Sequence, residues 1–346
     1  MTADQAQPAW PVGQIDVAAV KTWMTEVLPG VAEVVGPVAV YRSNPWGVTA
    51  RFIIVGDASR SDVVFKANFL PQGFTGGAIY DVLARHCRDD VPELLAWVDE
   101  PGRRWTLFRV FEGPVVGTLG GLEPLLAVAC ALARIQTAAA ELPASDTLLL
   151  PRVPVERMFA LFDDLLLHVE RWLHAERKLG GLAAVDPFNL PVNGLERLQA
   201  ARPLVAAWTD ELSAGGWPLS VHHVDLHVDN AVLQPNGRAL IYDWEEADIG
   251  FPFYSLDKLL MATADRSGAG DEEAGRIAEV RAAYLRRLPW KTQVERERAF
   301  EVALRLSPIR YASADVRFAA ALGWDPAEPV ARWLALAFQR WDDVEI

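Results

Sequence analysis

Cysteine is scarce in this chain of 346 residues. Only Cys87 and Cys130 occur, far apart in the sequence and without a pair of histidines near either of them. Two isolated cysteines indicate neither a disulfide framework nor a structural zinc site. We therefore expect a protein of the reducing cytoplasm.

Positive charge is also in short supply. The chain has 33 lysines and arginines against 46 aspartates and glutamates, which gives a formal net charge of -13. Nucleic acids and anionic membranes are bound chiefly through lysine and arginine, so we expect neither as the main partner. A small ligand that is neutral or cationic fits this composition better. Composition does not determine the oligomeric state.

Long hydrophobic runs are missing as well. The first eleven residues lack the basic start and apolar run of a secretory signal, and no uninterrupted apolar segment reaches membrane-spanning length. Yet 51% of the residues are hydrophobic, which is enough for a large core. The length favours two lobes or domains, and we expect a soluble intracellular protein.

The first third of the chain has a β-rich pattern. After an apolar helical stripe that ends near Pro29-Gly30, three β-rich runs separated by turn residues predict an antiparallel meander over 35–41, 48–55 and 62–69. A helix over 77–87 and strands over 94–98 and 105–111 follow. Glu112-Gly113-Pro114 is typical of a linker, so we predict a first domain of residues 1–112.

The remainder, residues 113–346, has mostly helical periodicity. Apolar spacings of three and four predict helices over 122–136, 155–178, 195–212, 274–288, 294–306 and 330–341. A short hairpin over 231–242, with Asn-Gly in its turn, interrupts them. The predicted fold class is α+β, with a small antiparallel β lobe and a large helical lobe.

Three polar residues around this hairpin have the chemistry that phosphoryl transfer requires. Such transfer needs magnesium at the phosphates, a carboxylate that orients the acceptor hydroxyl, and a cation near the phosphates. Asn230 and Asp243 offer the oxygen ligands that magnesium prefers, and hairpin pairing would bring them together. Asp225 precedes Asn230 on an irregular loop and can face the same cavity.

The segment His223-Val-Asp225-Leu-His227-Val-Asp-Asn230 resembles the His-x-Asp-x-His-x-x-Asn loop of the aminoglycoside phosphotransferase and choline kinase superfamily. The segment from Ile241 to Glu245, Ile-Tyr-Asp-Trp-Glu, resembles the second signature of that family. The resemblance implies a two-lobed protein-kinase-like fold, ATP or GTP as phosphate donor, and Mg²⁺. It implies Asp225 as catalytic base, Asn230 and Asp243 as metal ligands, and His223 and His227 as residues that brace the loop.

The resemblance extends upstream into the β-rich lobe, which would bind the nucleotide. Lys66 lies where the family places its phosphate-binding lysine, although a lysine that ends a strand is also common on protein surfaces. The loop that would cover the phosphates contributes Ser43, Asn44 and Gly47. Backbone groups of Arg109 and Phe111 would contact adenine at the hinge.

Two features depart from the family pattern. The helix after Lys66 normally supplies a glutamate partner for the lysine, but Gly76 or Gly77 stands there, and Asp81 is the nearest acid. The phosphate-covering loop has a single glycine, whereas a glycine-rich loop wraps phosphate more freely. The resemblance therefore leaves the partner of Lys66 open, and it leaves the choice of nucleotide open.

The function that the resemblance implies is transfer of phosphate to a hydroxyl of an aminoglycoside-like antibiotic or a small metabolite, with antibiotic resistance as one role. A choline, amino-alcohol or sugar kinase is the alternative, and a catalytically silent kinase-like binding protein is another. Glu245 and Glu246 are either acceptor-binding residues or a solvent-facing acidic pair. One or two tryptophans of the helical lobe should line the acceptor pocket, because aromatic faces suit sugars and cations.

Overall fold

The protein forms two compact units in a computed structural model that describes residues 10–11, 15–56, 59–69, 76–178, 190, 193–267 and 271–342. Unit 1 comprises Met1–Pro151 with His227–Ala247, and unit 2 comprises Arg152–Leu226 with Asp248–Ile346. This division follows backbone compactness. The predicted boundary between residues 112 and 113 separates a nucleotide-binding part from an acceptor-binding part. This functional division stays a prediction.

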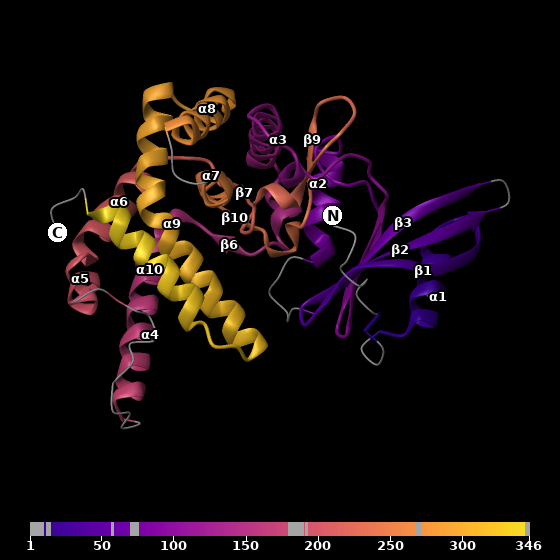
Figure 1. Ribbon diagram of the computed structural model, residues 1–346, viewed down its shortest axis with the longest axis horizontal. Helices are drawn as coiled ribbons and strands as arrows, with labels where there is room; N and C mark the ends of the chain where they lie inside the picture. The colour runs from indigo at the N-terminus through magenta and orange to yellow at the C-terminus, as the bar shows by residue number, and fades with distance from the viewer. Residues whose placement is uncertain are drawn as a thin grey trace. The chain divides into compact units, whose positions relative to one another are not determined.

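A five-stranded antiparallel sheet dominates unit 1, in the order β1-β2-β3-β5-β4 (Figure 1). Its strands are β1 Val31–Asn44, β2 Gly47–Gly56, β3 Arg60–Asn68, β4 Leu94–Glu100 and β5 Arg103–Arg109. The first three form the predicted meander, and their pairing is antiparallel throughout. Helices α1 (Val17–Val27) and α2 (Gly76–His86) also belong to this unit.

Alternation along β3 separates the core of unit 1 from its site. Val63, Phe65 and Ala67 are buried on one face, where Phe65 makes an edge contact with Trp105 at 5.6 Å between ring centroids. Successive side chains of a strand point to opposite faces of the sheet. Lys66 therefore projects from the face that lies opposite this aromatic core.

The predicted hairpin is present in unit 1 as β8 (Ala231–Leu233) and β9 (Ala239–Ile241). Its turn places Gly237 at φ 78°, a backbone conformation that glycine adopts without steric cost. Helix α3 (Glu123–Ala140) packs against β9, and the one-turn helix η4 (Val228–Asn230) leads into β8. The hairpin is thus held by a neighbouring helix.

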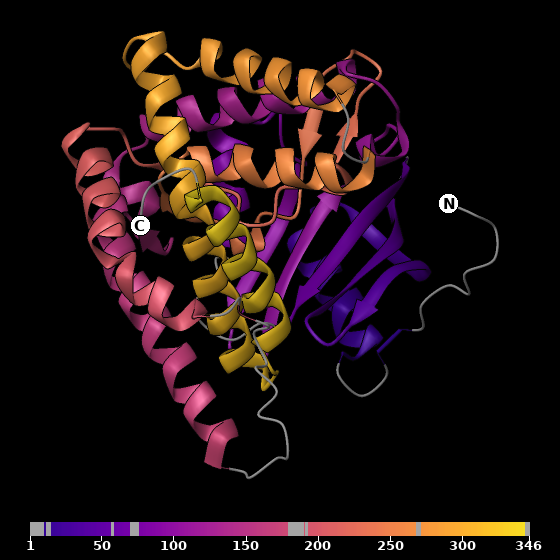
Figure 2. The same cartoon turned by 60° about the vertical axis from the view of Figure 1, so that its left-hand side comes forward.

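Unit 2 is mostly helical. Its helices are α4 Met158–Lys178, α5 Gly194–Ala200, α6 Arg202–Ala214, α7 Phe253–Ser267, α8 Asp271–Arg287, α9 Gln293–Leu322 and α10 Ala327–Trp341. Helices α9 and α10 run side by side in both views (Figures 1 and 2). The predicted α+β fold class is therefore confirmed.

Three details of unit 2 differ from the sequence prediction. The helix expected over 195–212 is two helices, α5 and α6, with Pro203 in the first turn of the second, where its missing N–H costs nothing. Helix α9 continues past Pro308, because packing against α4, α7 and α10 outweighs the lost hydrogen bond. A small sheet, β6 (Arg152–Val153), β10 (Asp248–Gly250) and β7 (Ser220–His222), has strands too short to predict.

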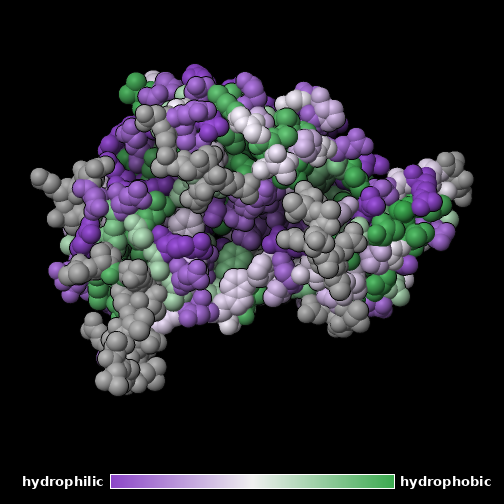
Figure 3. All heavy atoms as spheres, viewed as in Figure 1, coloured by the Kyte–Doolittle hydropathy of each residue, from purple (hydrophilic) through white to green (hydrophobic). Residues whose placement is uncertain are grey.

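The surface mixes hydrophobic and hydrophilic side chains, and Figure 3 shows hydrophobic residues among hydrophilic ones over the strands β1 to β3. Tyr41 on β1 is one of the large hydrophobic residues at this surface, and it is 52% exposed. Within the residues that the structure describes, no helix combines the length and the apolar character needed to cross a bilayer. Scattered exposed hydrophobic residues of this kind are ordinary for a folded surface.

Candidate active site

The centre of the site in unit 1 is Lys66 on β3. Its ammonium contacts the Asp243 carboxylate, and it lies 2.8 Å from Oε2 of Glu245. Only 18% of the Lys66 side chain is exposed. Burial acts to lower the pKa of the ammonium, but the two carboxylates outweigh that effect and hold the pKa above its ordinary value. Lys66 is therefore charged and held in place, which excludes the interpretation of a freely solvated lysine at a strand end.

Asp243 lies directly after the β8–β9 hairpin, in the left-handed region at φ 71°. The N–H of Tyr242 donates to the carbonyl of Asn230 at 2.9 Å, so Asn230 and Asp243 stand at the same end of the hairpin, as predicted. Burial acts to raise the pKa of Asp243, but Lys66 overrides it and the pKa lies well below its usual range. An ionised carboxylate beside a carboxamide is a donor set that fits magnesium, which commonly takes one or two protein oxygens.

Glu245 supplies a second carboxylate for Lys66. It lies on the short helix η5 (Trp244–Glu246), and only 4% of the residue is exposed. Burial and the nearby Asp243 raise the pKa of Glu245 to about 7, although Lys66 acts in the opposite direction. The solvent-facing interpretation is therefore wrong for Glu245, whereas Glu246 is partly exposed. An acceptor-binding role for either residue stays a prediction.

Tyr80 on α2 holds both carboxylate residues. Its hydroxyl accepts hydrogen bonds from the N–H groups of Asp243 (2.9 Å) and Trp244 (3.0 Å), and it lies 3.4 Å from Oε2 of Glu245. The side chain is buried, and burial together with Glu245 and Asp243 raises its pKa far above the usual value. The phenol is thus a neutral donor and acceptor.

The start of α2 explains why the expected helix glutamate is missing. A Cβ atom on Gly77 would lie 2.6 Å from Cβ of Trp97, and Gly76 has φ +51°. No side chain fits at Gly77 without movement of β4. Asp81 faces away and pairs with Arg85 at 3.1 Å on the helix surface. Lys66 takes its carboxylate partners from η5 and the end of the hairpin instead of from α2.

The predicted phosphate-covering loop is a tight hairpin between β1 and β2. Oδ1 of Asn44 accepts hydrogen bonds from the N–H groups of Trp46 (3.2 Å) and Gly47 (3.0 Å). A Cβ atom on Gly47 would meet the carbonyl of Ala67 at 2.6 Å, so close strand packing requires this glycine. Ser43 pairs with Val48 across the hairpin.

Arg42 on β1 adds a second cation close to this loop. Its guanidinium lies 3.3 Å from Oδ2 of Asp243, and it stacks over Trp46 at 5.8 Å from the ring centre. The Arg42 side chain is 47% exposed, so the pair with Asp243 is partly screened by solvent. Lys66 and Arg42 together give Asp243 two positive neighbours.

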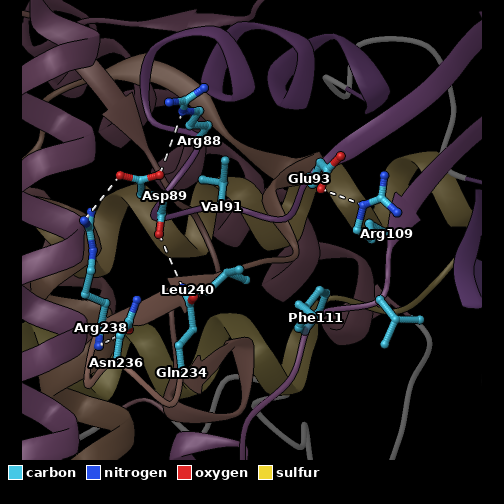
Figure 4. Close-up of a pocket in the computed structure, with 11 residues that line it drawn as sticks. Arg88, Asp89, Val91, Glu93, Arg109, Phe111, Gln234, Asn236, Arg238 and Leu240 are labelled. Atoms are coloured by element: carbon cyan, nitrogen blue, oxygen red, sulfur yellow. Dashed lines mark hydrogen bonds and ion pairs between the residues drawn. The ribbon is translucent and has the colours of Figure 1, made fainter. Parts of the chain in front are cut away.

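The predicted hinge residues Arg109 and Phe111 line a pocket of about 360 Å³ in unit 1. Figure 4 shows that its wall also includes residues of the β8–β9 hairpin, namely Gln234, Asn236, Arg238 and Leu240. Nε of Arg109 donates to Glu93 at 2.7 Å, and the backbone N–H of Arg109 donates to the Glu93 carbonyl at 3.0 Å. That amide is thus engaged within the protein, and contacts of Arg109 and Phe111 with adenine stay a prediction.

Asp225 belongs to unit 2, on the irregular loop after β7. Oδ1 of Asp225 lies 3.5 Å from Nζ of Lys258 on α7, and 43% of the Asp225 side chain is exposed. The N–H of His223 donates to Oγ of Ser255 at 2.9 Å, which ties this loop to α7. In unit 1, Nδ1 of His227 accepts from the N–H of Asp229 at 3.2 Å. The first contact uses the backbone of His223 and the second uses the ring of His227, and the bracing roles of the two histidines stay a prediction.

A separate buried cluster in unit 2 has a structural role. His222 on β7 lies 3.6 Å from Asp248 on β10, and Arg310 on α9 pairs with the other oxygen of Asp248. Burial lowers the pKa of His222. For Asp248 burial acts to raise the pKa, but Arg310 and His222 lower it overall. The three side chains are almost completely shielded from solvent, so the cluster holds β7, β10 and α9 together.

Sequence reasoning missed several residues of the site. Tyr80 carried a usable signal, because it lies one helical turn after Gly76 and Gly77 and hence on the same face of α2. Arg42 and Lys258 belong to no motif, whereas Tyr242 lies inside the second signature, immediately before Asp243, and was given no role. Its ring contacts Phe111 at 5.5 Å between ring centroids.

Known proteins share this fold. The choline kinase of Cryptosporidium parvum is 13% identical, with 95% of this chain and 96% of that chain covered and a TM-score of 0.57. The choline kinase LicA of Streptococcus pneumoniae is 13% identical, with coverages of 94% and 98% and a TM-score of 0.55. A spectinomycin phosphotransferase solved with ADP and spectinomycin is 12% identical, with coverages of 94% and 98% and a TM-score of 0.51.

No curated protein sequence matches the chain. The sequence pattern that defines the phosphotransferase enzyme family, however, matches residues 77–297, which is more than half of the chain. This range contains the predicted catalytic loop, both predicted metal ligands, Tyr80 and Glu245. The sequence resemblance and the predicted enzyme class are thereby confirmed. The chain belongs to the phosphotransferase enzyme family.

Proposed function

We propose that this phosphotransferase moves the γ-phosphate of ATP, or of GTP, to a hydroxyl of an aminoglycoside-like antibiotic or a small metabolite. The observation that carries the proposal is the cluster in unit 1. A shielded lysine is held by two carboxylates, and one of these stands beside Asn230 at the end of the hairpin. Phosphoryl transfer requires this combination of a fixed cation and oxygen ligands.

In this proposal the residues of unit 1 bind the nucleotide. Lys66 contacts the phosphates, and Arg42 offers a second cation beside the Ser43, Asn44 and Gly47 hairpin. Asn230 and Asp243 would hold Mg²⁺, which would supply positive charge to neutralise the phosphates. Because Lys66 has two carboxylate partners, the two can have different roles. Glu245 keeps the ammonium in place while Asp243 serves as a metal ligand.

Asp225 acts on the acceptor. Its carboxylate accepts a hydrogen bond from the acceptor hydroxyl and takes the proton as the new oxygen–phosphorus bond forms. The bond between the γ-phosphorus and its bridging oxygen breaks, and the nucleoside diphosphate leaves with that electron pair. Lys258 lies 3.5 Å from Asp225 and places a positive charge beside the carboxylate.

Two other functions compete with this proposal. A choline, amino-alcohol or sugar kinase would use the same machinery, and the similar structures include choline kinases and a spectinomycin phosphotransferase. The second alternative is a catalytically silent binding protein. Its motive is that the helix after Lys66 lacks the glutamate that the family normally has there. The contact between Lys66 and Glu245 weakens that motive, because it supplies a partner from another element.

The test is release of nucleoside diphosphate from ATP or GTP with magnesium, across aminoglycosides, other hydroxyl-bearing antibiotics, amino alcohols and sugars. Release that depends on an acceptor and is lost in Asp225→Asn and Asp243→Asn would support the proposal and identify the acceptor class. If no acceptor increases release and magnesium nucleotide does not raise the melting temperature, the protein is a silent relative.

A cytoplasmic location is part of the same proposal, because the enzyme needs the ATP or GTP that cells hold inside. Cell fractionation of a tagged chain tests this point. Recovery with the cytoplasmic fraction is expected, and recovery outside the cell membrane would contradict it. Antibiotic resistance is proposed only as one role, and it would require a change in antibiotic tolerance when the gene is deleted.

A further inference from the structure

Lys258 on α7 occupies an aromatic cation site in unit 2. Its ammonium lies 4.8 Å from the ring centre of Trp333 on α10 and 5.2 Å from that of Tyr311 on α9. Cation–π attraction acts within about 6 Å of a ring centre, so both rings attract the ammonium. The same ammonium lies 3.5 Å from Asp225.

The two rings are fixed by their own hydrogen bonds. Nε1 of Trp333 donates to Oδ2 of Asp315 at 2.6 Å, and the hydroxyl of Tyr311 donates to the carbonyl of Tyr254. Their centroids lie 4.9 Å apart with an interplanar angle of 36°. Tyr311 is buried, and Lys258 itself is 21% exposed. The site is therefore pre-organised for a cation, and the protein fills it with its own lysine.

We propose that Lys258 is a built-in occupant of the cation site beside Asp225, and that it excludes small amino alcohols such as choline and ethanolamine as acceptors. The acceptor is then an alcohol with no positively charged nitrogen within two carbons of the reacting hydroxyl. This inference rests on the proposed function, because it takes Asp225 as the residue that receives the acceptor hydroxyl.

The geometry gives the reason for this exclusion. In choline and ethanolamine only two carbons separate the hydroxyl from the nitrogen. A hydroxyl bound to Asp225 would place that nitrogen within a few ångströms of the carboxylate, where the Lys258 ammonium already lies at 3.5 Å. Two positive charges repel at such a distance, and a tethered lysine competes at a high effective concentration. Larger antibiotics whose amines lie further from the reacting hydroxyl do not meet this conflict.

The test measures binding of tetramethylammonium and choline by calorimetry, without nucleotide. Variant Lys258→Ala vacates the site, and it should bind tetramethylammonium at least tenfold more tightly than the unaltered protein. The double variant Lys258→Ala with Trp333→Ala should lose the gained affinity. Lys291→Ala, an exposed lysine of the same unit, is the matched control and should behave as the unaltered protein.

Equal affinity of the unaltered protein and of Lys258→Ala for tetramethylammonium would overturn the inference, provided that circular dichroism and melting temperature show the variant to be folded. Choline-dependent release of nucleoside diphosphate by the unaltered enzyme would also contradict it. Failure of the proposed function is distinguishable, because it would appear as absent turnover with every acceptor while these binding results stood.

Discussion

Asp243 in unit 1 and Asp248 in unit 2 are close neighbours in sequence, and both are ionised aspartates paired with a cation. Asp243 has 22% of its side chain exposed and is paired with Lys66 and with the half-exposed Arg42, whereas Asp248 is 1% exposed and is paired with Arg310, itself 3% exposed. A pair that solvent and ligands can reach is able to exchange partners, while breaking a fully buried pair leaves an uncompensated charge. The comparison teaches that accessibility separates a pair that can take part in binding from one that holds the fold together.

Removal of Arg310 should give the largest effect on stability. Arg310→Met leaves the Asp248 carboxylate buried without its main partner, which typically costs about 3–5 kcal/mol in the free energy of unfolding. Urea unfolding measures this loss. Arg298→Met, which breaks an exposed pair with Glu211, should cost about 1 kcal/mol or less. Equal losses of stability in the two variants would contradict the claim that the buried Arg310–Asp248 pair stabilises the fold.

Removal of Lys66 should instead lower activity. Lys66→Met is expected to reduce kcat/KM by about 10²–10³-fold, the typical cost of losing one fixed stabilising group at a reaction centre. Its loss of stability should be smaller than that of Arg310→Met, because Glu245 can take up a proton when its cation is gone. Lys21→Met on α1 serves as the control. Unchanged kcat/KM in Lys66→Met would contradict the functional assignment.

Loss of the Tyr80 hydroxyl should have a smaller effect. Tyr80→Phe leaves the N–H groups of Asp243 and Trp244 without their acceptor, which costs about 1–3 kcal/mol of stability for buried groups. The KM for nucleotide should rise with it, because Glu245 and Asp243 lose their support. Tyr41→Phe, at an exposed tyrosine, should change neither quantity. A Tyr80→Phe variant with unaltered stability and KM would show that the phenol supports nothing.

The pH dependence of stability tests the structural role of the buried cluster around Asp248. His222 has a folded pKa below its unfolded value because of burial, so the unfolded chain binds more protons as pH falls below about 6.5. Asp248 also has a lowered pKa, and it adds a further loss of stability below about pH 4. The His222 contribution to the free energy of unfolding should therefore fall from pH 7 toward pH 5, by at most about 1.4 kcal/mol per pH unit, whereas Glu245, whose folded pKa is raised to about 7, contributes a slope of the opposite sign over the same range.

Urea unfolding at pH 7, 6 and 5 measures that slope, with His222→Asn as the comparison. The variant should be less stable at pH 7, and between pH 7 and pH 5 it should lose less stability than the unaltered protein or gain some, because it keeps Glu245 but its unfolded chain lacks the titrating histidine. The same slope in both proteins would mean that other groups cause the pH dependence.

The local parts of the fold could be predicted from the sequence, and the long-range parts could not. The β1–β3 meander and the β8–β9 hairpin follow from alternation and turn residues, so the position of Asp243 beside Asn230 was predictable. The pairing of Lys66 with Glu245 joins β3 to η5, which are far apart in the sequence, so it depends on long-range packing. The position of Lys258 beside the rings of Tyr311 and Trp333 joins three helices and has no local signal.

The most direct test of the central claim is single-turnover transfer from magnesium ATP to the best acceptor of the panel, with the unaltered enzyme and Asp225→Asn side by side. We predict that Asp225→Asn slows transfer by about 10²–10⁴-fold, the usual contribution of a general base, while its affinity for magnesium nucleotide changes little. Undiminished transfer in Asp225→Asn would contradict the proposed mechanism and exclude Asp225 as the catalytic base.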